Sequence, residues 1–378
     1  MSWQLRLFLI TLLILVYTWA GYPALLWILR RVHARDIGRG SCEPHVSIIV
    51  AVHNEEKLIA AKLEDCLALQ YPRGRLEVLV ASDGSTDATE EIVQGFGARD
   101  PRIRLVRSEG RVGKSGAQNL AAHQANGDML LFTDADTRSR ANLLEPIVEN
   151  FADPRVGLVA AVVHFGEPED AVSKGQGSYW RYELFLRQLE SDIGILATAS
   201  GAALAVRRDL FRPIIPRFGD DCVIPLDVRL QGFRVIQEPR ALVFDQMPHT
   251  TEGELGARTR MTARNWTGTL NYRQLLNPMR FPGTAWGLVS HKLLRWLTPF
   301  FLAELFIVNT LLAVQGRLAI FWVSQAIFYI LAMVGWRRSR WQKSESVFGY
   351  PFAFCLANLG FFLGIVMSVR RKRVVAYK

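Results

Sequence analysis

Two aspartates that follow a short apolar stretch are the side chains in this sequence best suited to chemistry. Met129 to Phe132 have the pattern of a buried strand, and Asp134 and Asp136 come where that strand ends. Residues two apart on a strand point the same way, so we expect the two carboxylates to converge. Carboxylate oxygens suit Mg²⁺ or Mn²⁺ that is shared with the phosphates of a substrate. A solvated turn is the alternative, because aspartate also favours turns.

Further polar clusters follow other expected strands. Residues from about 41 to 250 alternate strand-like and helix-like patterns, which predicts an α/β domain with a largely parallel sheet. Asp83 and Lys114 lie in two such clusters, and ligands bind at the carboxyl ends of strands in open α/β sheets. Asp83 could accept a hydrogen bond from a nucleotide base, and Lys114 could neutralise a pyrophosphate. A turn aspartate and a solvated lysine are the alternatives.

An acid pair and an arginine pair lie further along the chain. Asp220 and Asp221 come just before an apolar helix pattern. The negative charge of one carboxylate raises the pKa of the other. One of the two acids could be the general base for an acceptor hydroxyl. Capping of the helix is the alternative. Arg260 and Arg264 share a helix face, which suits an anion such as a leaving diphosphate. Trp266 could stack on a sugar or lie at the membrane surface, and lipid headgroups are the alternative contact for both arginines.

The two ends of the chain are apolar enough to interact with a bilayer. Hydrophobic residues make up 50% of the sequence, and the net charge of +10 predicts an anionic partner. Residues 1–30 predict a retained transmembrane anchor with the following arginines in the cytoplasm. Residues 251–296 predict interfacial helices, and 297–369 contain about three segments of spanning length. Three crossings would place Arg370 to Arg373 outside, against the positive-inside rule, so a re-entrant or interfacial segment stays open.

The order of the motifs is more specific than any one of them. Strand–His-Asn-Glu, strand–Asp-Gly-Ser-Thr, Gly-Lys-x-x-Ala-x-Asn, Asp-Ala-Asp, Ser-Gly-Ala and Gly-Asp-Asp follow one another between residues 44 and 270. In this order they resemble family 2 glycosyltransferases of GT-A fold. The resemblance is greatest to the membrane-embedded branch that includes hyaluronan, chitin-oligosaccharide and cellulose synthases. It implies a Rossmann-like GT-A domain, residues 41–250, between N- and C-terminal transmembrane helices.

The resemblance also implies roles for individual residues. Donor-base contacts would come from Ala51, Glu55 and Asp83, and diphosphate contacts from Lys114. A divalent metal, Mg²⁺ or Mn²⁺, would lie at Asp134 and Asp136, and Asp221 would be the catalytic base. The Gln-x-x-Arg-Trp signature of processive enzymes is replaced here by Arg260-Met-Thr-Ala-Arg264-Asn-Trp266, so processive and single transfer both stay open.

The expected function is an inverting, metal-dependent transfer of a sugar from a nucleotide sugar, a UDP-sugar by resemblance. The acceptor would be a polysaccharide or a lipid-linked molecule at the cytoplasmic face of a bacterial-type inner membrane. One alternative is a non-processive enzyme that glycosylates a polyprenyl phosphate or a glycolipid. An alternative of another class is a non-catalytic sugar-binding membrane scaffold. Nucleic acid is not an expected partner, because the basic residues cluster at the membrane edges.

Overall fold

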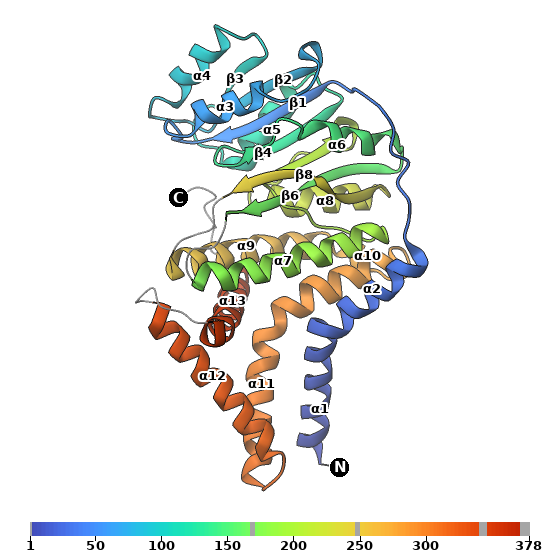
Figure 1. The fold of residues 1–378 in the computed structure, drawn as a ribbon, viewed down its shortest axis with the longest axis vertical. Coiled ribbons are helices and arrows are strands. Elements are labelled where there is room, and N and C mark those ends of the chain that lie inside the picture. The colour runs from blue at the N-terminus through green and yellow to red at the C-terminus, as the bar shows by residue number, and fades with distance from the viewer. Residues whose placement is uncertain (1, 167–170, 246–249, 340–345, 371–378) are drawn as a thin grey trace.

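The computed structural model describes residues 2–166, 171–245, 250–339 and 346–370. An α/β domain forms its upper part, the long helices Ala171–Asp192 and Thr251–Asn271 lie beneath that domain, and further helices extend downward from them (Figure 1). The strands are β1 Val46–Val52, β2 Leu76–Ser82, β3 Ile103–Arg107, β4 Met129–Asp134, β5 Arg138–Ser139, β6 Val156–Phe165, β7 Ala203–Arg207 and β8 Arg234–Asp245. The helices of the α/β domain are α3 Ile59–Leu67, α4 Thr89–Gly97, α5 Lys114–Gln124, α6 Leu144–Val148 and α8 Asp220–Leu230.

The remaining helices belong to the lower part of the molecule. They are α1 Trp3–Val16, α2 Tyr22–His33, α7 Ala171–Asp192, α9 Thr251–Asn271, α10 Pro282–Gly287, α11 Leu294–Val314, α12 Ala319–Ser339 and α13 Ser346–Val369. Two π-helical segments, Tyr17–Gly21 and Leu288–Leu293, join α1 to α2 and α10 to α11. The Tyr17 hydroxyl lies 2.8 Å from that of Ser290 and accepts a hydrogen bond from Trp286, so these two segments lie side by side.

The described strands form one mixed sheet, in the order β3-β2-β1-β4-β7-β6-β8-β5. Pairing is parallel from β3 to β4, as the alternating sequence pattern predicts. The sheet is less parallel than expected beyond β4, because β7 pairs antiparallel with both β4 and β6. The antiparallel strand contains the small residues after Ser200, and its alternate side chains are buried on both faces. The motif-bearing strands β1, β2 and β4 nevertheless end on one rim.

The core of the domain consists of two apolar layers, one on each face of the sheet. Alternate residues of β1 supply both, with Ile48 on one face and Ile49 on the other. Helices α3, α4 and α6 cover the first face, and α5 and α8 cover the second. Burial on both faces explains why these strands are almost continuously hydrophobic.

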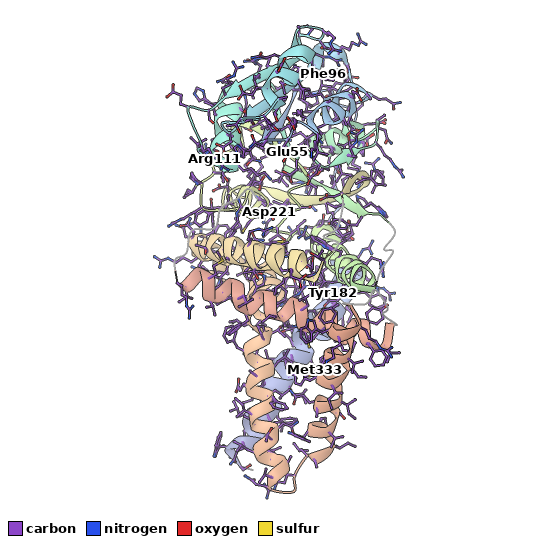
Figure 2. All side chains as sticks on the ribbon, turned by 90° about the vertical axis from the view of Figure 1, so that its left-hand side faces the viewer. Glu55, Phe96, Arg111, Tyr182, Asp221 and Met333 are labelled. Carbon is purple, nitrogen blue, oxygen red and sulfur yellow. The ribbon has the colours of Figure 1, made fainter. Side chains whose placement is uncertain are left out.

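Within the described ranges, four helical stretches are long and apolar enough to cross a membrane, namely Trp3–His33, Pro282–Val314, Ala319–Arg338 and Val347–Val369. They differ in direction. Helices α11 and α12 extend away from the α/β domain, whereas α13 runs across them, beneath α9 (Figures 1 and 2). Hydropathy alone does not distinguish these directions, because both kinds of helix carry apolar side chains.

Close packing of α13 against α9 depends on glycines spaced four apart. A Cβ added at Gly360 would lie 2.8 Å from the Cβ of Arg258, and one added at Gly364 would lie 2.6 Å from the Cβ of Thr262. Small residues at this spacing let two helix backbones approach, as in membrane helix pairs.

Replacing Gly364 with alanine is therefore expected to lower the free energy of unfolding by about 1–3 kcal/mol, the usual cost of overpacking. The added methyl group would also meet the Thr259 carbonyl at 2.8 Å, which side-chain rotation cannot relieve. The thermal unfolding temperature (Tm) in detergent measures the effect. Leu359→Ala is the control, because Leu359 is exposed on the same helix; equal Tm values for the two variants would contradict this packing role.

Candidate functional site

The rim of the sheet brings together residues from three strands. Ala51 of β1 lies in register with Ala81 of β2 on one side and with Asp134 of β4 on the other. Asp83 follows β2 directly, and Glu55 lies in the loop after β1. The parallel pairing of β1, β2 and β4 thus places the polar motifs on one edge, as their order in the sequence predicts.

Asp83 is fully buried and closes the loop that leads to Lys114. Its carboxylate accepts hydrogen bonds from the backbone N–H groups of Val112, at 2.6 Å, and Gly113, at 3.0 Å. Gly113 has a φ of +80°, a conformation that glycine adopts without a steric penalty. A nucleotide base would have to share this carboxylate with the loop.

Lys114 is held between two carboxylates. Its Nζ lies 2.6 Å from Oδ1 of Asp134 and 3.1 Å from Oδ2 of Asp220. The same Asp220 oxygen accepts a hydrogen bond of 2.7 Å from Gln118. Burial lowers the pKa of Lys114, but the two carboxylates outweigh burial and raise it above the ordinary value. The lysine therefore stays charged at the centre of the site, next to Asp134.

The acid pair forms the first turn of α8, and two other helices hold the segment before it. The Phe218 carbonyl accepts hydrogen bonds from the Ser115 hydroxyl of α5 and from the Arg264 guanidinium of α9, the latter at 2.8 Å. Negative side chains are favourable in the first turn of a helix, so capping and chemistry are compatible at this position. Arg264 thus positions the acid pair.

The two acids have opposite electrostatic environments. Burial raises the pKa of Asp220, but Lys114, Gln118 and Arg264 lower it to about 2. Burial and the neighbouring Asp220 raise the pKa of Asp221 above the ordinary value. Carboxylates with pKa values pushed apart in this way are typical of sites with a division of roles.

These shifts predict opposite effects of two matched substitutions on stability. A lowered pKa means that ionised Asp220 stabilises the fold at neutral pH, so Asp220→Asn should lower the free energy of unfolding by about 2–3 kcal/mol. The raised pKa of Asp221 means that its ionised form destabilises the fold, and Asp221 is ionised once the pH exceeds that pKa. The neutral side chain of Asp221→Asn should therefore raise Tm at pH 7.5. Melting curves of both variants at pH 7.5 check the signs; a Tm lowered equally by both would contradict the assignment.

A cavity of about 340 Å³ lies between the rim and the helices beneath the domain. Figure 2 shows Asp221 at this level, above the helices that cross below the sheet. Lys114, Asp134 and both members of the acid pair line the cavity, together with Arg260 and Arg264. Phe165 and Arg187 also line the cavity, and neither was predicted from the sequence. Trp180 of α7 lines it as well; the amphipathic pattern of residues 175–194 is compatible with lining an acceptor site, with packing on the sheet and with a membrane surface.

Trp266 lies apart from this cavity. Its ring packs against that of Trp296, with centroids 6.2 Å apart, in a cluster with Phe361 and Ile365. Arg264 and Trp266 are two apart on α9 and so face different directions. Trp266 therefore belongs to the packing between α9, α11 and α13, and we do not include it in the proposed donor site.

The second aspartate of the Asp-x-Asp motif lies just beyond the strand. β4 ends at Asp134, and Asp136 is exposed in the following bend. Burial raises the pKa of Glu55, and Asp136, Asp87 and Asp134 raise it further, so acidic side chains gather at this end of the sheet. Among the described residues no three His, Cys, Asp or Glu side chains form a ready metal cage. Carboxylate oxygens are hard ligands, so Asp134 and Asp136 fit a hard cation that takes further oxygen ligands from phosphate and water.

The sequence profile of glycosyl transferase family 2 matches residues 47–215, the segment that carries the rim motifs. The chain contains a family 2 glycosyltransferase domain. Over 168 residues it is 30% identical to the beta-monoglucosyldiacylglycerol synthase of Nostoc sp., covering 44% of this chain and 36% of that protein. It is 25% identical over 221 residues to the poly-beta-1,6-N-acetyl-D-glucosamine synthase of Staphylococcus aureus, covering 57% and 53%.

A solved structure extends the likeness to the helices at both ends of the chain. The mannosyltransferase PcManGT from Pyrobaculum calidifontis, in complex with GDP-Man and Mn²⁺, superposes with a TM-score of 0.68 over 93% of this chain and 99% of that one, at 24% identity. This likeness confirms the predicted GT-A fold with helices at both ends. The chain spans about a third to a half of the two curated relatives named above.

Proposed function

We propose that the protein transfers a sugar from a nucleotide sugar to an acceptor hydroxyl with inversion at the anomeric carbon. The observation that carries the proposal is the position of Lys114 between Asp134 and Asp220, on the wall of a cavity that Asp221 also lines. A buried cation suits a diphosphate, and a neighbouring carboxylate with a raised pKa suits proton transfer. The family 2 domain supports the same class of reaction.

Single displacement assigns a distinct task to each group. The acceptor oxygen attacks the anomeric carbon on the face opposite the bond to the diphosphate, and Asp221 takes the proton of that hydroxyl. The carbon–oxygen bond to the donor breaks, and Lys114 and Arg260 neutralise the departing diphosphate. Attack on the opposite face needs one base and no covalent enzyme intermediate, as in inverting glycoside hydrolysis.

The other donor contacts lie at the far end of the rim. We assign the nucleoside to the edge formed by Ala51, Glu55 and Asp83, with Asp83 also holding the loop before Lys114. Asp134 and Asp136 would hold Mg²⁺ or Mn²⁺, which neutralises phosphate charge when bound. PcManGT, which has the same fold, is described as a complex with GDP-Man and Mn²⁺, and this supports the assignment.

We place the catalytic domain on the cytoplasmic face of the inner membrane. If α1, α11 and α12 cross and α13 lies along the surface, then Arg30, Arg31, Arg337 and Arg370 are all on one side, as the positive-inside rule requires. Arg371 to Arg373 lie outside the described residues. Two C-terminal crossings instead of three thus remove the conflict that the sequence alone presents.

The proposal is tested with the full chain purified in membranes. A panel of radiolabelled nucleotide sugars is supplied with a total lipid extract, and label is followed into lipid and into insoluble polymer. Incorporation of one sugar, lost in Asp221→Asn, is the expected result. A non-catalytic scaffold would bind a nucleotide sugar with neither transfer nor slow hydrolysis, and that outcome would overturn the proposal.

A further inference from the structure

A second cavity, of about 610 Å³, lies on the other side of the layer formed by α7 and α9. Trp19, Tyr179, Tyr182, Leu302, Phe328 and Phe354 form much of its wall. They come from the N-terminal helical stretch, α7 and the three C-terminal helices. The volume is typical of a ligand pocket, and the lining is predominantly aromatic and apolar.

One end of this cavity carries a buried cation with an unused donor. Arg258 is 5% exposed; its Nε donates to Glu254, and its guanidinium carbon lies 4.2 Å from the centroid of the Tyr179 ring. Its Nη1 is buried and has no hydrogen-bond partner within the described ranges. A buried N–H that lacks an acceptor costs free energy, and an oxyanion would supply the acceptor.

A second arginine strengthens the positive character of that end. Arg295 donates through Nη1 to Glu183 at 2.7 Å, but its Nε and Nη2 are buried without a partner in the described structure. Its guanidinium carbon lies 5.1 to 5.4 Å from the ring centroids of Trp19, Tyr179 and Tyr182, all of which line the cavity. Arg258 thus lines the cavity together with its ion-pair partner Glu254, and Arg295 lies behind the aromatic wall, while the rest of the lining is mainly apolar and aromatic.

Both features suit one kind of occupant. A soluble anion would leave the aromatic wall exposed, and a neutral hydrocarbon would leave the arginine donors without acceptors. An amphiphile with a phosphate at one end and a hydrocarbon chain at the other satisfies both. Several of the lining residues belong to helices that are long and apolar enough to cross a membrane, which favours a lipid as the occupant.

The cavity lies one helix layer from the catalytic site. On α7, Tyr179 lines this cavity, and the next residue, Trp180, lines the cavity that contains Asp221. On α9, Arg258 lines this cavity, and the preceding residue, Ala257, lines the one that contains Asp221. A phosphate bound near Arg258 would therefore hold its attached saccharide next to the layer of α7 and α9 that separates the two cavities.

We propose that this cavity binds the hydrocarbon chain and the phosphate of a lipid-phosphate-linked acceptor. Binding of a lipid phosphate is argued from the cavity alone, whereas its role as the acceptor rests on the proposed sugar transfer. The acceptor class is thereby narrowed from any polysaccharide or lipid to a saccharide carried on a lipid phosphate.

The first test needs no activity. Full-length protein in phosphatidylcholine vesicles is photolabelled with a diazirine-bearing hexadecyl phosphate, and the modified peptides are mapped. Adducts on the peptides containing Phe328 and Phe354 are expected, with competition by hexadecyl phosphate and much weaker competition by hexadecanol. Equal competition by the alcohol, or labelling confined to bilayer-facing positions, would overturn the phosphate site.

Variants then separate the site from the reaction. Ala353 lines the cavity, so Ala353→Trp should fill it, and Arg258→Gln should remove the phosphate donor. Each change should lower specific labelling about ten- to a hundredfold. Ile327→Trp is the matched control, because Ile327 is exposed on α12. Donor hydrolysis without acceptor should be unchanged in Ala353→Trp, while transfer to extracted lipid is lost. Labelling lost with transfer intact would overturn the acceptor role alone, and absent hydrolysis in the wild type would count against the proposed function alone.

Discussion

Asp221→Asn is expected to slow sugar transfer by about 10²–10⁴-fold while leaving nucleotide-sugar affinity within a few fold. In the proposed mechanism Asp221 acts on the acceptor proton, whereas Lys114, assigned to the donor phosphates, pairs with the other acid, Asp220. Single-turnover rates and donor binding, measured on the same preparation, separate the two effects. A loss of donor affinity as large as the loss of rate would make Asp221 a binding residue instead.

The pH profile provides an independent check on the same residue. Burial and Asp220 raise the pKa of Asp221, so the ionised base becomes scarce at a higher pH than for a free aspartate. Transfer by the wild type should therefore fall as pH decreases through this raised pKa, and the residual activity of Asp221→Asn should lack that limb. Asp220→Asn removes the like charge and should move the limb to lower pH, although it also weakens the fold.

Removal of divalent metal is the second change with a large expected effect. Chelation should abolish transfer, and added Mn²⁺ or Mg²⁺ should restore it, because Asp134 and Asp136 lie where the phosphates of the donor would lie. Asp136→Asn should require much more metal for half-maximal rate. Asp128→Asn is the control, since Asp128 lies at the opposite end of β4, where it accepts a backbone hydrogen bond from His45. Near-normal turnover of Asp136→Asn in chelator would contradict the metal assignment.

The parts of the fold that local pattern determines could be predicted from the sequence. The largely apolar strands end at Val52, Ser82 and Asp134, and polar residues lie at or just after each end. Parallel pairing then places these polar residues on one rim. The position of β7 could not be predicted in this way. Its direction depends on how the long segment between β6 and β7 folds back, and small residues are compatible with either direction.

The same distinction holds for the site. Lys114, Asp220 and Asp221 could be proposed because their types and spacing suit diphosphate and proton chemistry. Arg187 could not be proposed, because the sequence does not indicate whether an arginine on an amphipathic helix lines a cavity or faces solvent. Trp266 shows the converse: an aromatic residue near two arginines suggests stacking on a sugar, but its direction depends on the packing of α13, which lies about one hundred residues later.

The double ion pair of Lys114 also implies a thermodynamic linkage between donor and metal. An incoming diphosphate must exchange with Asp134 for the lysine, and the released carboxylate is then a stronger attractor for a divalent cation. Whatever factor the donor contributes to metal affinity, the metal must contribute to donor affinity, because binding free energies around a closed cycle sum to zero. Donor and metal would thus bind with positive cooperativity, because the donor takes Lys114 from the carboxylate that the metal needs.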